Sequence, residues 1–119
     1  MDYETPDLLV RDVKGVTIVR VRYSTFDGIA EVQRITAELD QILARGVRKL
    51  VIDFKYVKFA GSAALGLLIA TQKKMQDLGG KMVVSHAENI DELLRVSHTA
   101  RLFNLAPDPR EAFKLFSNE

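Results

Sequence analysis

The chain has 119 residues, 47% of them apolar and 28% charged, and its 17 basic residues nearly balance its 16 acidic ones. A chain of this length is expected to form one domain over residues 1–119 that buries its own core. The absence of cysteine excludes disulfides, thiolate nucleophiles and cysteine-based metal sites, and the even charge argues against binding to nucleic acid.

The first part of the chain predicts two strands and a helix. Leu8–Val10 and Gly15–Tyr23 are rich in β-branched residues and are separated by a glycine turn. Asp27-Gly28 marks a break, after which Ile29–Ala44 has apolar residues at helical spacing and Gly46 follows as a stop. The predicted buried stripe of this helix is Ile29, Val32, Ile35, Leu39, Ile42 and Leu43.

The rest of the chain alternates short strands with helices. The short apolar run Lys49–Phe54 predicts a buried strand, and Ser62–Leu78 predicts a helix that ends at a Gly-Gly pair. The later predicted segments are the strands Lys81–Ser85 and Phe103–Leu105 and the helices Ile90–Val96 and Arg110–Phe116. The predicted stripe of the second helix is Leu65, Leu68, Ile69, Gln72, Met75 and Leu78.

This order predicts an α/β fold with one mixed β-sheet, whose later strands are parallel and whose helices pack mainly on one face. The longest apolar run, Ala63–Ala70, has eight residues, whereas about 20 are needed to span a bilayer. The first seven residues contain three acids and no base, unlike a secretory signal. We therefore expect a cytoplasmic protein that makes no membrane contact.

The most informative segment is the start of the second helix, where Ser62 is surrounded by small residues. The unpaired N–H groups of a first helical turn favour a negative charge, so a phosphoryl group on Ser62 would be stabilised there and would change a smooth surface strongly. The simpler interpretation is that Ser62 is the N-cap of the helix, a common role for serine.

A catalytic interpretation would use Ser62 as nucleophile, His86 or His98 as base and Asp53 to orient the base. The segment lacks the G-x-S-x-G pattern of such nucleophiles. His86 and Glu88 are too few ligands for a metal site. We expect no catalytic activity, no cofactor and no metal.

The layout of the chain resembles the STAS domain, the fold of bacterial anti-sigma factor antagonists. The resemblance extends from the Val-Thr-Ile-Val-Arg-Val strand through Lys-Leu-Val-Ile-Asp-Phe to the C-terminal Arg-Glu-Ala-Phe. The matching positions are Asp53, Phe59, Ser62, Leu65, Gly66, Gly79 and Gly80.

The resemblance implies that the chain is a binding module, without activity of its own, that is switched by phosphorylation of Ser62. The implied partner is a serine-kinase-type anti-sigma factor with an ATPase domain, which the unmodified form captures. A phosphatase would reset the cycle, and homodimer formation is left open. The implied partner-binding residues are Lys55, Lys58, Phe59, Ala60, Gly61, Ser62, Ala63 and Leu65.

Three positions depart from the family motif Asp-Ser-Ser/Thr-Gly-Leu-Gly: Gly61 replaces the aspartate, Ala63 the second hydroxyl residue and Ala64 the first glycine. The alternative is therefore a STAS scaffold that is not phosphorylated and binds a protein or small ligand constitutively. Lys55 and Lys58 could pair with a phosphate on Ser62. They belong to a larger basic set that either is simply solvated or meets an acidic partner: Arg20, Arg22, Arg45, Arg48, Lys49, Lys55 and Lys58.

Overall fold

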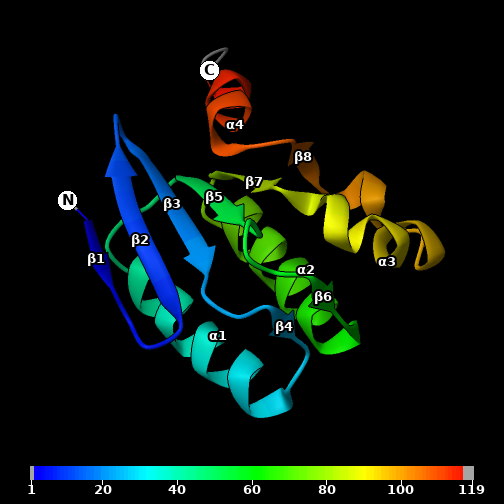
Figure 1. The fold of residues 1–119 in the computed structure, drawn as a ribbon. Coiled ribbons are helices and arrows are strands. Elements are labelled where there is room, and N and C mark those ends of the chain that lie inside the picture. The colour runs from blue at the N-terminus through cyan, green and yellow to red at the C-terminus, as the bar shows by residue number, and fades with distance from the viewer. Residues whose placement is uncertain (1, 117–119) are drawn as a thin grey trace.

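Six strands form one mixed sheet in the order β1-β2-β3-β5-β7-β8 (Figure 1). The computed structural model describes residues 2–116. The strands of this sheet are β1 (Asp2–Glu4), β2 (Leu8–Val13), β3 (Val16–Val21), β5 (Lys49–Asp53), β7 (Lys81–Ser85) and β8 (Asn104–Ala106). The helices are α1 (Ile29–Leu43), α2 (Ser62–Asp77), α3 (Asp91–Val96) and α4 (Pro109–Phe116), with 3-10 turns at Ala87–Ile90 and Ala100–Leu102.

The direction of the strands follows from their connections. β1, β2 and β3 are antiparallel neighbours, and β2 turns into β3 through Lys14 and Gly15, which both have positive φ. β5, β7 and β8 continue the sheet in parallel with β3. This confirms the predicted mixed sheet with parallel later strands.

The central strands β5 and β7 are buried on both faces. In β5, Leu50 and Ile52 belong to one core and Val51 to the other, and Val83 of β7 faces the same side as Val51. Strands buried on both faces have continuous apolar sequences rather than alternating ones, which explains the unbroken runs in these two segments.

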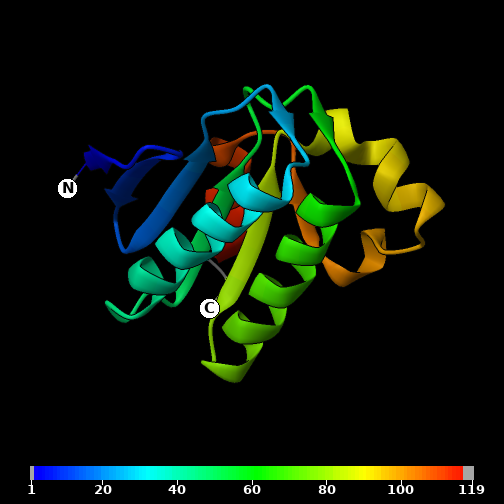
Figure 2. The same cartoon turned by 90° about the horizontal axis from the view of Figure 1, so that it is seen from below.

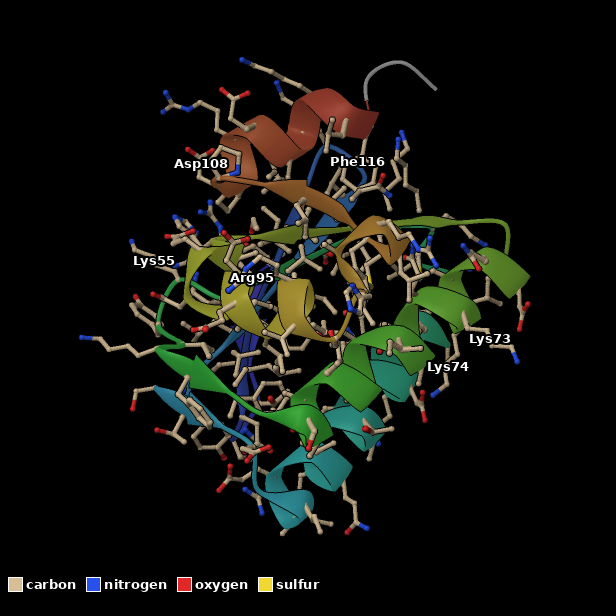
Figure 3. The ribbon with its side chains drawn as sticks, turned by 90° about the vertical axis from the view of Figure 1, so that its right-hand side faces the viewer. Lys55, Lys73, Lys74, Arg95, Asp108 and Phe116 are labelled. Carbon is tan, nitrogen blue, oxygen red and sulfur yellow. The ribbon has the colours of Figure 1, made fainter. Side chains whose placement is uncertain are left out.

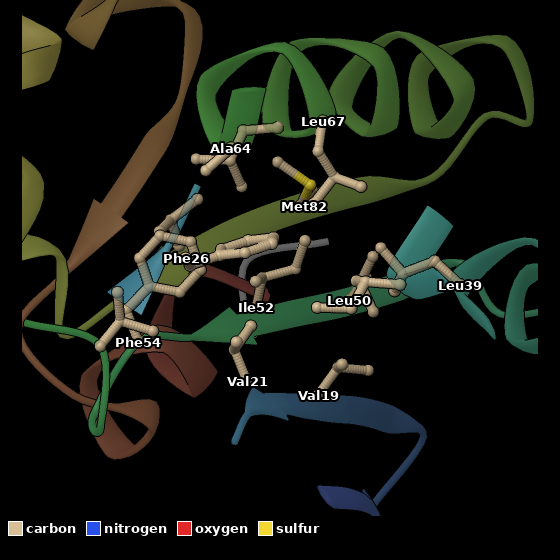
Figure 4. Close-up of a cluster of buried hydrophobic side chains, with 14 of the residues drawn as sticks. Val19, Val21, Phe26, Leu39, Leu50, Ile52, Phe54, Ala64, Leu67 and Met82 are labelled. Carbon is tan, nitrogen blue, oxygen red and sulfur yellow. The ribbon is translucent and has the colours of Figure 1, made fainter. Parts of the chain in front are cut away.

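The larger core lies between the sheet and the helices α1 and α2, which lie side by side (Figure 2). Phe26 and Phe54 meet edge to face at 6.1 Å between ring centroids in the part of this core drawn in Figure 4. Lys74 of α2 donates to Asp40 of α1 at 2.6 Å and joins the two helices. α3 adds Leu94 to the same core.

The predicted stripe of α2 was wrong in part. Its buried residues are Ala64, Leu67, Leu68, Thr71 and Met75. Ile69 and Leu78 are exposed and Leu65 is only half-buried. The buried face includes the polar Thr71, whose hydroxyl donates to the Leu67 carbonyl at 2.8 Å and is therefore satisfied inside the core. In α1 the stripe was right for Ile35, Leu39, Ile42 and Leu43, whereas Val32 is half-buried and Ile29 is 72% exposed.

The C-terminal helix α4 covers the opposite face of the sheet. Ala112 and Phe116 pack there against Val51, Val83 and Ala106. The helices are therefore mainly, but not entirely, on one face, as Figure 2 shows with α4 behind the sheet.

Two short strands that the sequence pattern did not predict form a second, parallel pair: β4 (Thr25–Phe26) and β6 (Phe59–Ala60). β6 lies between the strand predicted at Lys49–Phe54 and the helix predicted from Ser62, where no strand was expected. Because β4 leads into α1 and β6 leads into α2, this pair sets the two helix starts next to each other (Figure 1).

Candidate functional site

The β4–β6 pair fixes the backbone in front of α2. The N–H groups of Lys58 and Phe59 both donate to the Ser24 carbonyl, at 2.7 and 3.1 Å, and the Gly61 N–H donates to the Phe26 carbonyl at 3.3 Å. These bonds hold the segment in place up to the residue before Ser62, so the start of α2 is a defined position on the surface.

Ser62 is exposed and is the first residue of α2. The N-cap is Gly61, so the interpretation of Ser62 as the N-cap was wrong. Within residues 2–116 the Ser62 hydroxyl has no hydrogen-bond partner, and α2 begins without a cap from its own N-cap side chain. The hydroxyl is therefore accessible at a helix end whose N–H groups carry partial positive charge.

Asp27 reaches this helix end from the neighbouring segment after β4. Its Oδ1 accepts a hydrogen bond from the Ala63 N–H at 3.4 Å. Sequence reasoning missed this role, because the local pattern at Asp27 indicates only a break in the chain. The sequence does show an acidic residue just before α1. However, the helix whose N–H Asp27 contacts is α2, which lies far away in the sequence.

Exposed apolar side chains lie on β6, on the first turn of α1 and along α2. Phe59 of β6 is 54% exposed and Ile29 at the start of α1 is 72% exposed. Along α2, Leu65 is half-buried and Ile69 is exposed on the outer side. We call Ile29, Phe59, Ser62, Leu65 and Ile69 the α2 surface. Exposed large apolar side chains are typical of protein-binding surfaces when they form a patch.

The other residues predicted for partner binding differ in exposure. Ala60 and Gly61 are buried and shape the backbone instead of forming surface, while Ala63 is half-buried. Lys55 and Lys58 are exposed in the loop before α2. In Figure 3, Lys55 lies well apart from Lys73 and Lys74 of α2.

The larger basic set does not form one patch. Arg20 pairs with Asp53, Arg22 donates to the Thr5 carbonyl, and Arg45 lies over the Tyr3 ring at 4.8 Å. These contacts tie strands and helix ends to their neighbours. Lys55 and Lys58 are thus the members of the set that lie in the loop leading to Ser62.

A buried polar cluster lies at the carboxyl ends of β3, β5 and β7. Asp53 is fully buried and accepts from Arg20 Nε at 2.6 Å and from Ser85 Oγ at 2.8 Å. Its Oδ1 also lies 2.6 Å from His86 Nδ1. Both carboxylate oxygens of Asp53 therefore have polar partners, and these contacts join β5 to its two neighbours β3 and β7.

The catalytic arrangement considered from the sequence is only partly assembled. Asp53 does contact His86, but no hydrogen bond joins Ser62 to either histidine in the described part of the chain. His98 is exposed. Residues 2–116 contain no group of three or more potential metal ligands, and no helix among them is long and apolar enough to cross a membrane.

Residues 7–112 match the family model of the STAS domain. The chain therefore belongs to the STAS domain family, as the sequence resemblance predicted. No curated protein matches the chain in sequence.

Solved structures with the same fold include several anti-sigma factor antagonists. One is a STAS domain protein from Planctomyces limnophilus, with a TM-score of 0.80, 19% identity, and 93% of this chain and 99% of that one covered. An antagonist from Mycobacterium paratuberculosis has a TM-score of 0.75 and 25% identity over 95% and 97% of the two chains. Unphosphorylated SpoIIAA has a TM-score of 0.73 and 15% identity over 94% and 99%.

Proposed function

We propose that this chain is a cytoplasmic bacterial antagonist that captures a serine-kinase-type anti-sigma factor through the α2 surface and is released when Ser62 is phosphorylated. The observation that supports this most is the exposed, unpaired Ser62 hydroxyl at the start of α2, among exposed apolar side chains. The family supports the general role, because its solved members include anti-sigma factor antagonists.

The switch follows from the surroundings of Ser62. In the unmodified state, the small hydroxyl permits a close apolar contact between Phe59, Leu65 and the partner. A phosphoryl group adds about 1.5–2 negative charges, which would have to lose their water for the partner to stay bound. The partner is therefore displaced. Lys55 and Lys58, which are exposed in the loop leading to Ser62, are the cations nearest to it along the chain. A phosphatase that removes the group restores binding.

The test compares the affinity of three variants for a kinase-type anti-sigma factor from the same organism. Ser62→Asp is expected to weaken binding at least about tenfold, or about 1.4 kcal/mol, because it adds a charge at the contact. Ser62→Ala should bind as well as the wild type. Gln41→Glu is the matched control, because it adds the same charge at an exposed position of α1 outside the α2 surface. It should leave affinity unchanged.

Equal binding by Ser62→Asp and wild type would contradict the switch and favour a scaffold that binds constitutively. Hydrolysis of a simple ester that disappears in Ser62→Ala would instead support an enzyme.

A further inference from the structure

Gly61 is buried and yet has an ordinary backbone conformation. Its φ of −103° and ψ of −166° are open to any L residue, so conformation does not explain why glycine is found here. The explanation lies in space. A Cβ atom at position 61 would overlap the carboxylate of Asp27, with all three carboxylate atoms well inside the 3.0 Å that real Cβ atoms keep.

The Asp27 carboxylate does what an N-cap side chain normally does. A capping aspartate or serine accepts a hydrogen bond from the second or third N–H of the helix. In α2 the second N–H is that of Ala63, and Asp27 accepts from it at 3.4 Å. Gly61, the actual N-cap, has no side chain that could do so.

We propose that Asp27 and Gly61 are a matched pair, in which Asp27 caps α2 from the neighbouring segment and thereby positions Ser62, and Gly61 leaves the space for it. The positioning part of this inference rests on the proposed function. The pairing itself is a property of the folded chain and is independent of the proposed function.

Asp27 also supplies a carboxylate near Ser62, although the residue directly before Ser62, Gly61, has none. The parallel register aligns Phe26 with Ala60, so the residues that follow, Asp27 and Gly61, continue side by side. One carboxylate is thus held at the start of α2 by β4 instead of by the segment before α2. An additional carboxylate at position 61 would place two negative charges in the same volume, which is strongly unfavourable.

The decisive experiment measures thermal unfolding of Gly61→Asp in two backgrounds. With Asp27 present, the two carboxylates collide and the Tm should fall by about 3–8 °C, the size expected for one lost cap. In the Asp27→Ala background, the introduced carboxylate can cap α2 itself, so the same substitution should raise the Tm. Gly66→Asp is the control, since Gly66 has open space around it, and its effect should be equal in both backgrounds.

A shift of the same sign in both backgrounds would overturn the pairing. The positioning role is read from affinity for the anti-sigma factor. Asp27→Ala should weaken binding about tenfold, and the exchange Asp27→Ala with Gly61→Asp should restore it to within about threefold of the wild type. Reversal of the Tm effect without restored binding would overturn positioning alone.

These outcomes separate the two proposals. If the wild type binds no anti-sigma factor, the proposed function fails, and the sign reversal still decides the pairing. If the wild type binds and the sign does not reverse, the pairing fails and the proposed function stands.

Discussion

The accessibility of Ser62 depends on the residues beside it in the chain. Gly61 carries no side chain and Ala63 is small, so neither covers the hydroxyl. The first-turn position leaves the backbone N–H of Ser62 without an intrahelical acceptor. A larger side chain at position 63 would reduce access to the hydroxyl, whereas any side chain at position 61 would also collide with Asp27.

A second residue with unusual surroundings is Glu38 on α1. Both of its carboxyl oxygens are buried and have no hydrogen-bond partner among residues 2–116. Burial, and after it the neighbouring Asp7, raise the pKa of Glu38 above its ordinary value of 4.5. Asp7 itself is buried and accepts from the Tyr23 hydroxyl and from Arg34, at 3.3 Å from Nε.

This pKa shift predicts a pH-dependent stability. Because the folded protein binds the Glu38 proton more tightly than the unfolded chain does, the protonated carboxyl stabilises the fold at low pH. That contribution is lost as pH rises from 4.5 through the raised pKa of Glu38. Glu38→Gln should therefore stabilise the protein at pH 7–8 by about 1 kcal/mol, the cost of one unpaired buried group.

Urea unfolding of wild type and Glu38→Gln at several pH values measures this effect. The gain should shrink on acidification, as the wild-type carboxyl becomes neutral. Glu31→Gln, on the first turn of the same helix, serves as the control. A gain that is the same at pH 4 and pH 8 would show that the Glu38 charge is not the cause.

At the scale of elements, α2 has a buried face and an outer face, and we propose that the outer face binds the partner. The face containing Ala64, Leu68 and Met75 packs against the sheet, and the outer side carries Ser62 and Ile69. Neighbouring residues in the helix therefore lie on different faces.

This division predicts that two adjacent substitutions affect different properties, one mainly stability and the other mainly binding. Leu68→Ala removes a side chain that is 1% exposed and should lower the free energy of unfolding by about 2–5 kcal/mol. Ile69→Ala, at 39% exposure, should cost less than about 1 kcal/mol but weaken binding to the anti-sigma factor. Chemical denaturation and a binding titration measure the two quantities. Equal destabilisation by both substitutions would mean that the buried face has been assigned incorrectly.

The sequence pattern predicted the main elements because most of them carry a strong local signal. The unbroken apolar runs of β5 and β7 and the helical spacing in α1 depend only on residues near one another. The face of α2 was harder to predict, because the small Ala64 and the polar Thr71 are buried while the larger apolar Ile69 and Leu78 are exposed. Strands as short as β4 and β6 have no period to detect.

For the molecule as a whole, the sheet order decides which distant residues meet. Ser62 and the loop before it could be identified from the sequence, through small residues at a helix start and the family resemblance. Asp27 could not, since its contact with Ala63 spans 36 residues and depends on the pairing of two unpredicted strands. The contact of Asp53 with His86 likewise arises only when β5 and β7 become neighbours.

The central claim is that Ser62 is the residue that switches partner binding. The most direct test is the intact mass of the full chain after incubation with the kinase-type anti-sigma factor and ATP, followed by size-exclusion chromatography. We predict that the wild type gains one phosphoryl group and separates from the partner, whereas Ser62→Ala gains none and stays bound. Tight binding without any gain in mass, or a phosphoryl group retained in Ser62→Ala, would contradict the account.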